Sequence, residues 1–277
     1  HLNLEHFIEA NQLFHQIVSQ DPNYAEAWNN LGLALKGLER FEDALQCIEK
    51  AIILNNQYAE AYDNKGLVLI ELERFSEAMT EFQTALKLKP DDHEIYNNIG
   101  IAHMKLKQLH EAITNYNLSL KINPKYAEAI NNRGLVYQEL LEFDKALIDF
   151  NQAIEMKTEY AEAINNRGLL FKDQRLFDKA IVDLKFAFKL NPKLSDVNFN
   201  LSMIYLLQLN FKEGWKCYEK RRKVSDYLKK TEYFNKIYLT EIPKDQEPIL
   251  LFSEQGIGDQ IIYLSLLHEL INLPNLI

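Results

Sequence analysis

Residues 127–160 read AEAINNRGLVYQELLEFDKALIDFNQAIEMKTEY, and residues 161–194 read AEAINNRGLLFKDQRLFDKAIVDLKFAFKLNPKL. The two stretches align without a gap, and the same pattern extends in both directions with a period of 34 residues. A fixed period of this length indicates a repeat architecture, in which each unit packs on the next. We number the repeats one to six: 25–58, 59–92, 93–126, 127–160, 161–194 and 195–228.

Small residues recur at the eighth and twentieth positions of the repeats. Each repeat contains two amphipathic stretches, such as Ala25–Leu38 and Phe41–Leu54, with apolar residues at helical spacing. We expect the small residues to let two helices approach closely, and the recurrent proline after the second stretch to stop that helix. The eighth position holds Gly32, Gly66, Gly100, Gly134, Gly168 and Ser202, and the twentieth holds Ala44, Ala78, Ala112, Ala146, Ala180 and Gly214.

This pattern resembles the tetratricopeptide repeat (TPR) family over roughly residues 1–228. The resemblance implies an all-α fold, a right-handed TPR α-solenoid whose concave groove is lined mainly by the first helix of each pair. Residues 1–24 correspond to an N-terminal half repeat, with Phe7, Ala10 and Pro22 in phase. The sixth repeat departs from the pattern, and we interpret it as a capping unit.

The composition narrows the possible functions. The chain has 277 residues, 31 Lys and Arg against 40 Asp and Glu, and a formal net charge of −9. An acidic chain does not suit the phosphates of nucleic acid, and no apolar run reaches the length of a membrane span. We therefore expect neither a nucleic-acid nor a membrane partner. Cys47 and Cys217 are too few for a disulfide scaffold, which favours the cytoplasm.

Asparagine occupies the sixth position of all six repeats. This position lies away from the second helix, and six asparagines in mid-helix carry a cost in helix propensity. An amide side chain can bind the backbone of an extended peptide. Such a row resembles the asparagine ladder of protein O-linked N-acetylglucosamine transferases, although the same residues could instead bond a neighbouring helix. The asparagine row is Asn30, Asn64, Asn98, Asn132, Asn166 and Asn200.

Aliphatic residues occupy the ninth position, nearly opposite the apolar arc that faces the second helix. They form either an exposed stripe that supports the side chains of a peptide, or contacts between successive first helices. The predicted site takes four of them together with the asparagine row. The aliphatic row is Leu33, Leu67, Ile101, Leu135, Leu169 and Met203, and the four site residues are Leu67, Ile101, Leu135 and Leu169.

Charged residues mark two further positions. The second position is acidic in every repeat, which either attracts a basic peptide or complements the dipole of the first helix. Arg133 and Arg167, at the seventh position, could meet an acidic ligand or pair with this acidic row nearby. The acidic row is Glu26, Glu60, Glu94, Glu128, Glu162 and Asp196.

The repeats lack a recognisable catalytic or metal-binding constellation. His93, His110 and His268 are each followed by glutamate, but no histidine lies four residues further on, which excludes the paired-histidine zinc helix. A phosphate-binding loop that ends in Lys-Ser or Lys-Thr is also absent from the sequence. Cys47 and Cys217 share one repeat position and fit packing better than nucleophilic catalysis. We predict no catalytic residue, no metal ligand and no cofactor for these residues.

The character of the sequence changes after the repeats. Residues 229–248 suggest a linker, and 249–277 suggest a strand, a glycine turn and a helix, the start of a Rossmann-like α/β unit. The junction resembles that of bacterial TPR proteins fused to a GT-B glycosyltransferase-like domain, similar to heptosyltransferases. The resemblance implies a truncated domain, so we expect this piece to be inactive and a longer parent to use a nucleotide sugar. The turn residues are Glu254, Gln255, Gly256, Gly258 and Asp259.

These features predict a scaffold for protein–protein interaction whose groove binds an extended peptide or a partner protein. The second resemblance suggests the substrate-recruiting arm of a larger protein glycosyltransferase. A general TPR adaptor, or a scaffold that assembles with itself, is the alternative.

Overall fold

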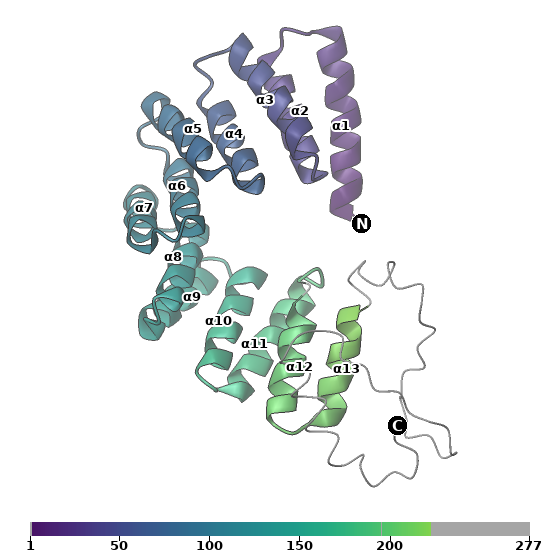
Figure 1. The fold of residues 1–277 in the computed structure, drawn as a ribbon, viewed down its shortest axis with the longest axis vertical. Helices are drawn as coiled ribbons and strands as arrows, with labels where there is room; N and C mark the ends of the chain where they lie inside the picture. The colour runs from purple at the N-terminus through teal and green to yellow at the C-terminus, as the bar shows by residue number, and fades with distance from the viewer. Residues whose placement is uncertain (1, 195, 223–277) are drawn as a thin grey trace, which may run out of the picture. The chain divides into compact units, whose positions relative to one another are not determined.

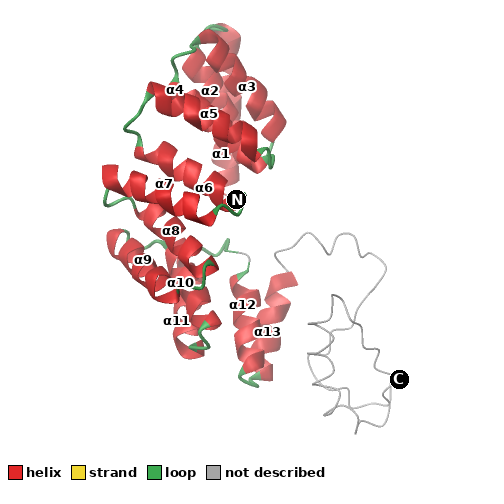
Figure 2. Cartoon of the chain, turned by 60° about the vertical axis from the view of Figure 1, so that its left-hand side comes forward, coloured by secondary structure: helices red, strands yellow, loops and turns green. Residues whose placement is uncertain are grey.

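A computed structural model describes residues 2–194 and 196–222, which lie in a unit that runs from His1 to Val224. The expected linker 229–248 and the expected α/β start at 249–277 lie outside the described residues, as does the end of the sixth repeat. The described residues form thirteen α-helices and no strand (Figures 1 and 2). The helices are α1 (Leu2–Gln20), α2 (Ala25–Gly37), α3 (Phe41–Leu54), α4 (Ala59–Glu71), α5 (Phe75–Leu88), α6 (His93–Lys105), α7 (Leu109–Ile122), α8 (Ala127–Glu139), α9 (Phe143–Met156), α10 (Ala161–Asp173), α11 (Phe177–Leu190), α12 (Val197–Leu207) and α13 (Phe211–Arg222).

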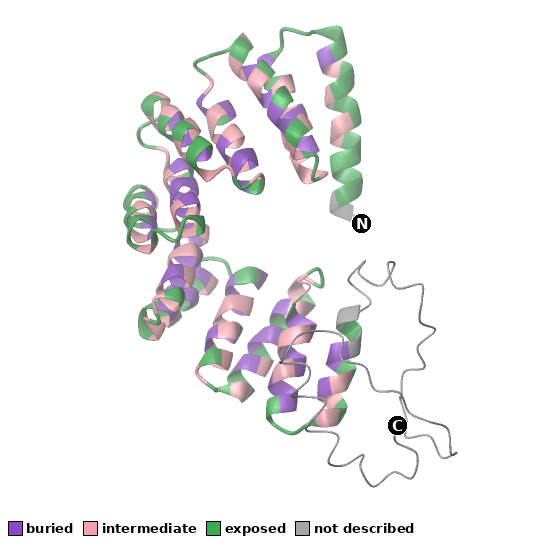
Figure 3. Ribbon diagram, in the orientation of Figure 1, coloured by how far each residue is buried: buried purple, intermediate pink, exposed green. Residues whose placement is uncertain are grey.

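The helices pack as pairs that follow the repeats. The main contacts join α2 with α3, α4 with α5, and so on to α12 with α13, and each pair also contacts the next. This arrangement confirms the predicted all-helical TPR-like solenoid for the described residues. In Figure 3 buried residues recur along α2 to α12, whereas α1 is mostly exposed. One pair cannot bury its apolar faces alone, and the buried clusters accordingly combine residues of neighbouring pairs.

The regular spacing of small residues sets the distance between paired helices. A Cβ atom added to Gly66 would lie 2.4 Å from Cε1 of Phe82, and one added to Gly100 would lie 2.5 Å from Cε1 of Tyr116. The alanines at the twentieth position are fully buried in repeats one to five. These contacts confirm the expected reason for the small residues, because a side chain at the eighth position would force the two helices apart.

The turn between the two helices of each repeat has a common geometry that no sequence pattern predicts. Glu39 has φ of 59°, in the left-handed region. Its N–H donates to the carbonyl of Lys36 and the N–H of Arg40 donates to the carbonyl of Leu35, both at 2.9 Å. This is the Schellman motif, which usually carries glycine at the left-handed position. The equivalent residues are Glu39, Glu73, Lys107, Leu141, Arg175 and Leu209.

The sixth repeat departs from its neighbours in structure as well as in sequence. Helix α12 begins at Val197 and has 11 residues, whereas the first helices of the other repeats have 13. Ser202 replaces the glycine of the eighth position, and its hydroxyl is buried with no hydrogen-bond partner among the described residues. Gly214 replaces alanine and lies against Leu206.

Candidate functional site

The side of the first helices that faces away from the second helices forms a continuous surface. Each of α2, α4, α6, α8 and α10 contacts the next first helix, whereas successive second helices make no comparable contact among the described residues. The first helices are therefore closer together than the second helices, so they lie on the inner side of the stack. We call the exposed surface of α2, α4, α6, α8, α10 and α12 the inner face.

Four asparagines of the row link their first helices to the one before. In each case the amide nitrogen donates to the fifth-position side chain of the preceding repeat, so the two residues are 35 apart in the sequence. The bonds run from Asn64 to Asn29 at 3.0 Å, from Asn98 to Asp63 at 3.0 Å, from Asn132 to Asn97 at 3.0 Å, and from Asn166 to Asn131 at 3.0 Å. We call these four bonds the amide ladder.

The ladder fixes the asparagines without using their full hydrogen-bonding capacity. An amide side chain has two N–H groups and one acceptor oxygen, and the ladder uses one N–H. Asn64, Asn132 and Asn166 stay half-buried, and no donor among the described residues bonds to their Oδ1 atoms. Asn98 differs, because it is 8% exposed and its Oδ1 accepts from Nδ2 of Asn97 at 3.3 Å. Asn98 is therefore the member of the row least open to a ligand.

The ladder does not continue into the sixth repeat. Nδ2 of Asn200 donates to the carbonyl of Asp196 in its own helix at 3.0 Å, and Oδ1 of Asn200 accepts from Nζ of Lys172 at 3.0 Å. Oδ1 of Asn165, the acceptor expected from the pattern, is buried and has no hydrogen-bond partner in the part of the chain that the structure describes. Asn30, in the first repeat, is half-buried on α2.

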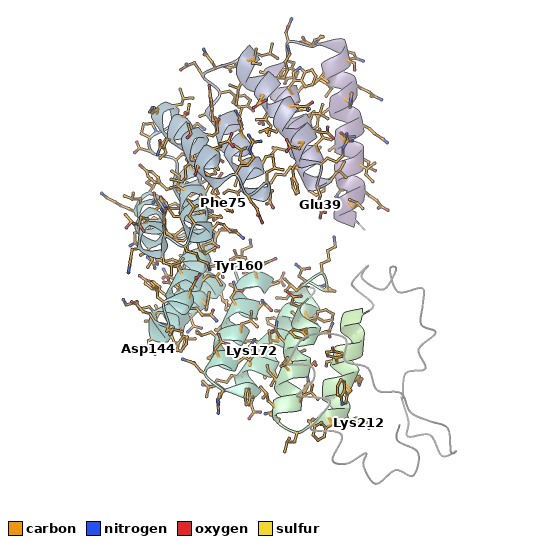
Figure 4. All side chains as sticks on the ribbon, viewed as in Figure 1. Glu39, Phe75, Asp144, Tyr160, Lys172 and Lys212 are labelled. Carbon is orange, nitrogen blue, oxygen red and sulfur yellow. The ribbon has the colours of Figure 1, made fainter. Side chains whose placement is uncertain are left out.

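The sequence analysis did not identify two groups of residues on this surface. The first group is the fifth-position acceptors of the ladder, which the adjacent Asn-Asn pairs would have indicated at a spacing of 35 residues. Tyrosines at the last position of three repeats also approach the first helices: Oη of Tyr58 accepts from Nδ2 of Asn29 at 3.4 Å, and Tyr160 is 8% exposed. Burial, aided by Glu94 and Glu128, raises the pKa of Tyr126 to about 12. Figure 4 labels Tyr160 between α9 and α10.

The four aliphatic site residues contribute to the core and remain partly accessible. Leu67 and Ile101 pack against the core of repeats one to three, Leu135 packs against that of repeats four and five, and Leu169 against that of repeats five and six. All four are half-buried. The row thus contributes to the core. Its contacts between successive first helices and its use by a ligand both stay predictions.

The acidic row lies at the starts of the first helices. Glu26, Glu60, Glu94, Glu128 and Glu162 fall in the first turns, where a carboxylate complements the helix dipole. Several of them also bond the residue that follows the second helix of the same repeat. Glu60 pairs with Lys89, whose hydrogen bond lowers the pKa of the Glu60 carboxyl, and Glu128 pairs with Lys157 at 3.1 Å.

The seventh-position cations turn away from the inner face. Arg133 binds the buried carboxylate of Asp149 through Nε at 2.8 Å and Nη2 at 2.7 Å, and its Nη1 donates to Oδ1 of Asn117 at 2.6 Å. Arg167 makes the same contacts with Asp183 and Asn151. The pairing with the acidic row at the second position that the sequence suggested for these arginines is wrong, because both bind aspartates of the second helices.

Two further expectations concern residues or properties beyond this surface. The turn residues Glu254, Gln255, Gly256, Gly258 and Asp259 lie outside the described residues. Among the residues that the structure describes, no helix combines the length and the apolar character needed to cross a bilayer.

Comparisons with known proteins agree with the repeat pattern. Models described as TPR repeat and tetratricopeptide repeat match residues 25–58, 66–107 and 91–159. No curated protein matches the chain.

The solved structures that resemble the fold include two with TM-scores above 0.6. One is the crystal structure of the APC/C hetero-tetramer Cut9–Hcn1, with 17% identity and a TM-score of 0.73 over 80% of this chain and 44% of that chain. The present chain thus spans less than half the length of that relative. The other is TTC0263, a thermophilic TPR protein of Thermus thermophilus, with 24% identity and a TM-score of 0.61 over 66% of this chain and 99% of that chain. At these identities the likeness shows the fold alone.

Proposed function

Since the chain is a tetratricopeptide repeat protein, we propose that its inner face binds an extended segment of a partner protein. The repeats form a scaffold suited to protein–protein interaction. The proposal rests on the hydrogen bonding of Asn64, Asn132 and Asn166. The amide ladder holds these side chains in place, and one N–H and the oxygen of each remain for a ligand.

The chemistry of an amide suits an extended backbone. Each peptide group offers one N–H donor and one carbonyl acceptor, and an asparagine side chain can bind both. Because the ladder already restricts the side-chain rotamers, binding costs less conformational entropy than it would for free side chains. The accessible parts of the aliphatic row add apolar contact. The complex named for Cut9–Hcn1 agrees with a role of this fold in protein assembly, although it says nothing of the present partner.

The test is a peptide titration. Fluorescein-labelled peptides of four Lys-Thr-Ser, four Gln-Thr-Ser or four Glu-Thr-Ser repeats would be titrated with the chain and followed by fluorescence anisotropy. The triple variant Asn64→Ala, Asn132→Ala, Asn166→Ala should weaken binding of the tightest peptide by about 100-fold, since three hydrogen bonds of about 1 kcal/mol each are removed.

The control is a triple variant on exposed positions of the second helices, Gln46→Ala, Gln83→Ala, Glu155→Ala. It should bind as the wild type does. Circular dichroism and thermal unfolding report whether each variant keeps its helices, and the single variants replace the triple one if it unfolds. Equal affinity of the wild type and a folded asparagine variant would exclude the asparagine row from binding.

A finer proposal is that the inner face recruits substrates for a glycosyltransferase domain. Its support is the sequence of residues 249–277 and its resemblance to the start of a GT-B-like domain. A nucleotide sugar would then serve as the donor of a longer natural chain. Nucleoside diphosphate release from a panel of nucleotide sugars, measured with that longer chain and a bound peptide, tests the proposal. Lack of release with every donor would leave the general adaptor.

Self-assembly is the remaining alternative for the scaffold. Light scattering over a range of concentrations distinguishes it from binding of a different partner. A molecular mass that stays at that of one chain, 32.5 kDa, would exclude it for this piece.

A further inference from the structure

The charges of the first helices are not balanced at the inner face. The sequences of α2, α4, α6, α8, α10 and α12 contain six lysines and arginines against nine aspartates and glutamates. Three of the six cations, Lys65, Arg133 and Arg167, are bound to carboxylates of second helices; Lys65 contacts Glu49 at 3.1 Å and Glu81 at 3.0 Å. In these described helices, only three lysines are left to add positive charge to the inner face: Lys36, Lys105 and Lys172.

Cations from outside the first helices compensate part of the acidic excess. Glu60, Glu128 and Glu139 pair with Lys89, Lys157 and Lys107. The other six carboxylates have no lysine or arginine nitrogen within 4.0 Å among the described residues. These six are Glu26, Asp63, Glu71, Glu94, Glu162 and Asp173. The inner face therefore keeps a net negative charge, and a ligand that complements it is basic.

Asp63 stands out among these carboxylates. It occupies the fifth position, where the other ladder acceptors are Asn29, Asn97 and Asn131. Oδ1 and Oδ2 of Asp63 accept from the single Nδ2 of Asn98, at 3.0 and 3.1 Å. An asparagine at this position could accept the same bond, as it does in three other repeats. The ladder therefore does not require a charge here.

The groups around Asp63 leave its charge poorly compensated. Asp92 and Glu94 approach from the start of α6, and Tyr126 from the start of α8, while Lys36 on α2 is the opposing cation. Burial first, and then the two acidic neighbours, raise the pKa of the Asp63 carboxyl from 3.8 to about 6. Burial also lowers the pKa of Lys36, so this lysine is itself held in an unfavourable environment.

We propose that the bound segment is basic, and that a lysine or arginine side chain of it pairs with Asp63 on the inner face over α2, α4 and α6. The inference rests on the proposed function and adds the chemistry of the partner. A cation brought by the ligand supplies the counter-charge that Lys36 supplies only in part. Asp63 thereby sets the charge preference of the face, while the asparagines hold the backbone of any sequence.

The test compares the three peptides defined above on the wild-type chain and on Asp63→Asn. On the wild type, the lysine peptide should bind more tightly than the glutamine peptide, and the glutamate peptide more weakly than both. Asp63→Asn should weaken the lysine peptide by about tenfold, as expected when one charged hydrogen-bond partner is lost, and leave the glutamine peptide unchanged. Asp144→Asn, which removes one charge from an exposed position at the edge of α9 in Figure 4, should change neither.

A pH series on the wild type gives a second measurement that needs no variant. Affinity for the lysine peptide should fall as Asp63 takes up a proton, with a midpoint at or below pH 6 because the bound cation favours the carboxylate. The glutamine peptide should show no such step.

The outcomes separate the two proposals. If no peptide binds the folded chain, both the binding function and the charge preference are wrong. If the three peptides bind equally, or Asp63→Asn weakens all of them alike, the charge preference is overturned and the binding function stands. Should Asp63→Asn lose its helices, the pH series decides: a lysine-peptide affinity that stays constant between about pH 4 and pH 8 overturns the inference.

Discussion

Replacing Glu39 by glycine is expected to stabilise the chain, although it removes a side chain and adds backbone freedom. Glu39 ends the turn between α2 and α3 with φ of 59° (Figure 4). Its side chain is exposed and forms no hydrogen bond or ion pair with the described residues, so its removal costs little. The backbone conformation therefore decides the sign of the effect.

The magnitude follows from two opposing contributions. A residue other than glycine in the left-handed region costs about 1–2 kcal/mol because its Cβ approaches a carbonyl oxygen. Glycine loses more conformational freedom on folding, which costs about 0.5–1 kcal/mol. The balance favours glycine by about 0.5–1 kcal/mol at this position. The same backbone reasoning applies to the other left-handed residues, although at Lys107 the substitution also removes an ion pair with Glu139, and distant substitutions should add.

The assay is urea unfolding followed by circular dichroism, with Glu155→Gly as the matched control. Glu155 is an exposed residue within α9, where the change from glutamate to glycine should destabilise by about 1 kcal/mol or less. One chemical change is thus expected to act with opposite signs at two positions. A lower urea midpoint for Glu39→Gly than for the wild type would refute the reasoning.

Three further substitutions test the packing and the charges. Gly66→Ala should destabilise by about 1–3 kcal/mol because the new Cβ would lie 2.4 Å from Phe82; an unchanged urea midpoint would contradict the close helix contact. Arg133→Ala should lower the free energy of unfolding by about 3–5 kcal/mol because it leaves the carboxylate of Asp149, which is 3% exposed, without its partner. The double variant Arg133→Leu, Asp149→Cys, which has the residues found at these positions in repeat one, should recover most of this loss. Equal melting temperatures of the two variants would argue against the ion pair. Asp63→Asn should raise the free energy of unfolding by about 2 kcal/mol at pH 7 and by little at pH 3. The reason is that folding raises the pKa of the Asp63 carboxyl, so the wild type loses stability as the pH rises from the unfolded-state pKa towards 6. A gain that does not depend on pH would refute this.

The sequence contains enough information to place the helices, because the repeat multiplies a weak local signal. One amphipathic stretch is ambiguous, but small residues at two fixed positions in successive repeats require that two helices meet there, as Gly66 and Phe82 show. The left-handed turn residues could not be found this way. Glutamate, lysine, leucine and arginine share no propensity for this conformation, which is imposed by the tight connection between two packed helices.

The candidate site was predicted less completely because hydrogen bonds between repeats depend on which side chain faces which. The asparagine row was apparent from its period, but its acceptors lie 35 residues away on another helix. The direction of Arg133 was also open, since its partner Asp149 is 16 residues away and meets it only when the helix pair closes. Side chains in adjacent positions of one helix are about 100° apart and can meet different helices, as Asn132 and Arg133 do, and periodicity alone does not assign the partner.

One substitution tests, through two expected effects, whether the inner face is a binding surface. Asparagine at position 63 would keep the bond from Asn98 and relieve the repulsion from Asp92 and Glu94, so it should yield a more stable chain at neutral pH. If Asp63 served only the fold, its replacement would bring this gain and nothing else. A variant that is more stable and yet binds the lysine peptide less tightly would show that the charge serves recognition at a cost to stability, which is the usual relation between a binding site and the scaffold that carries it.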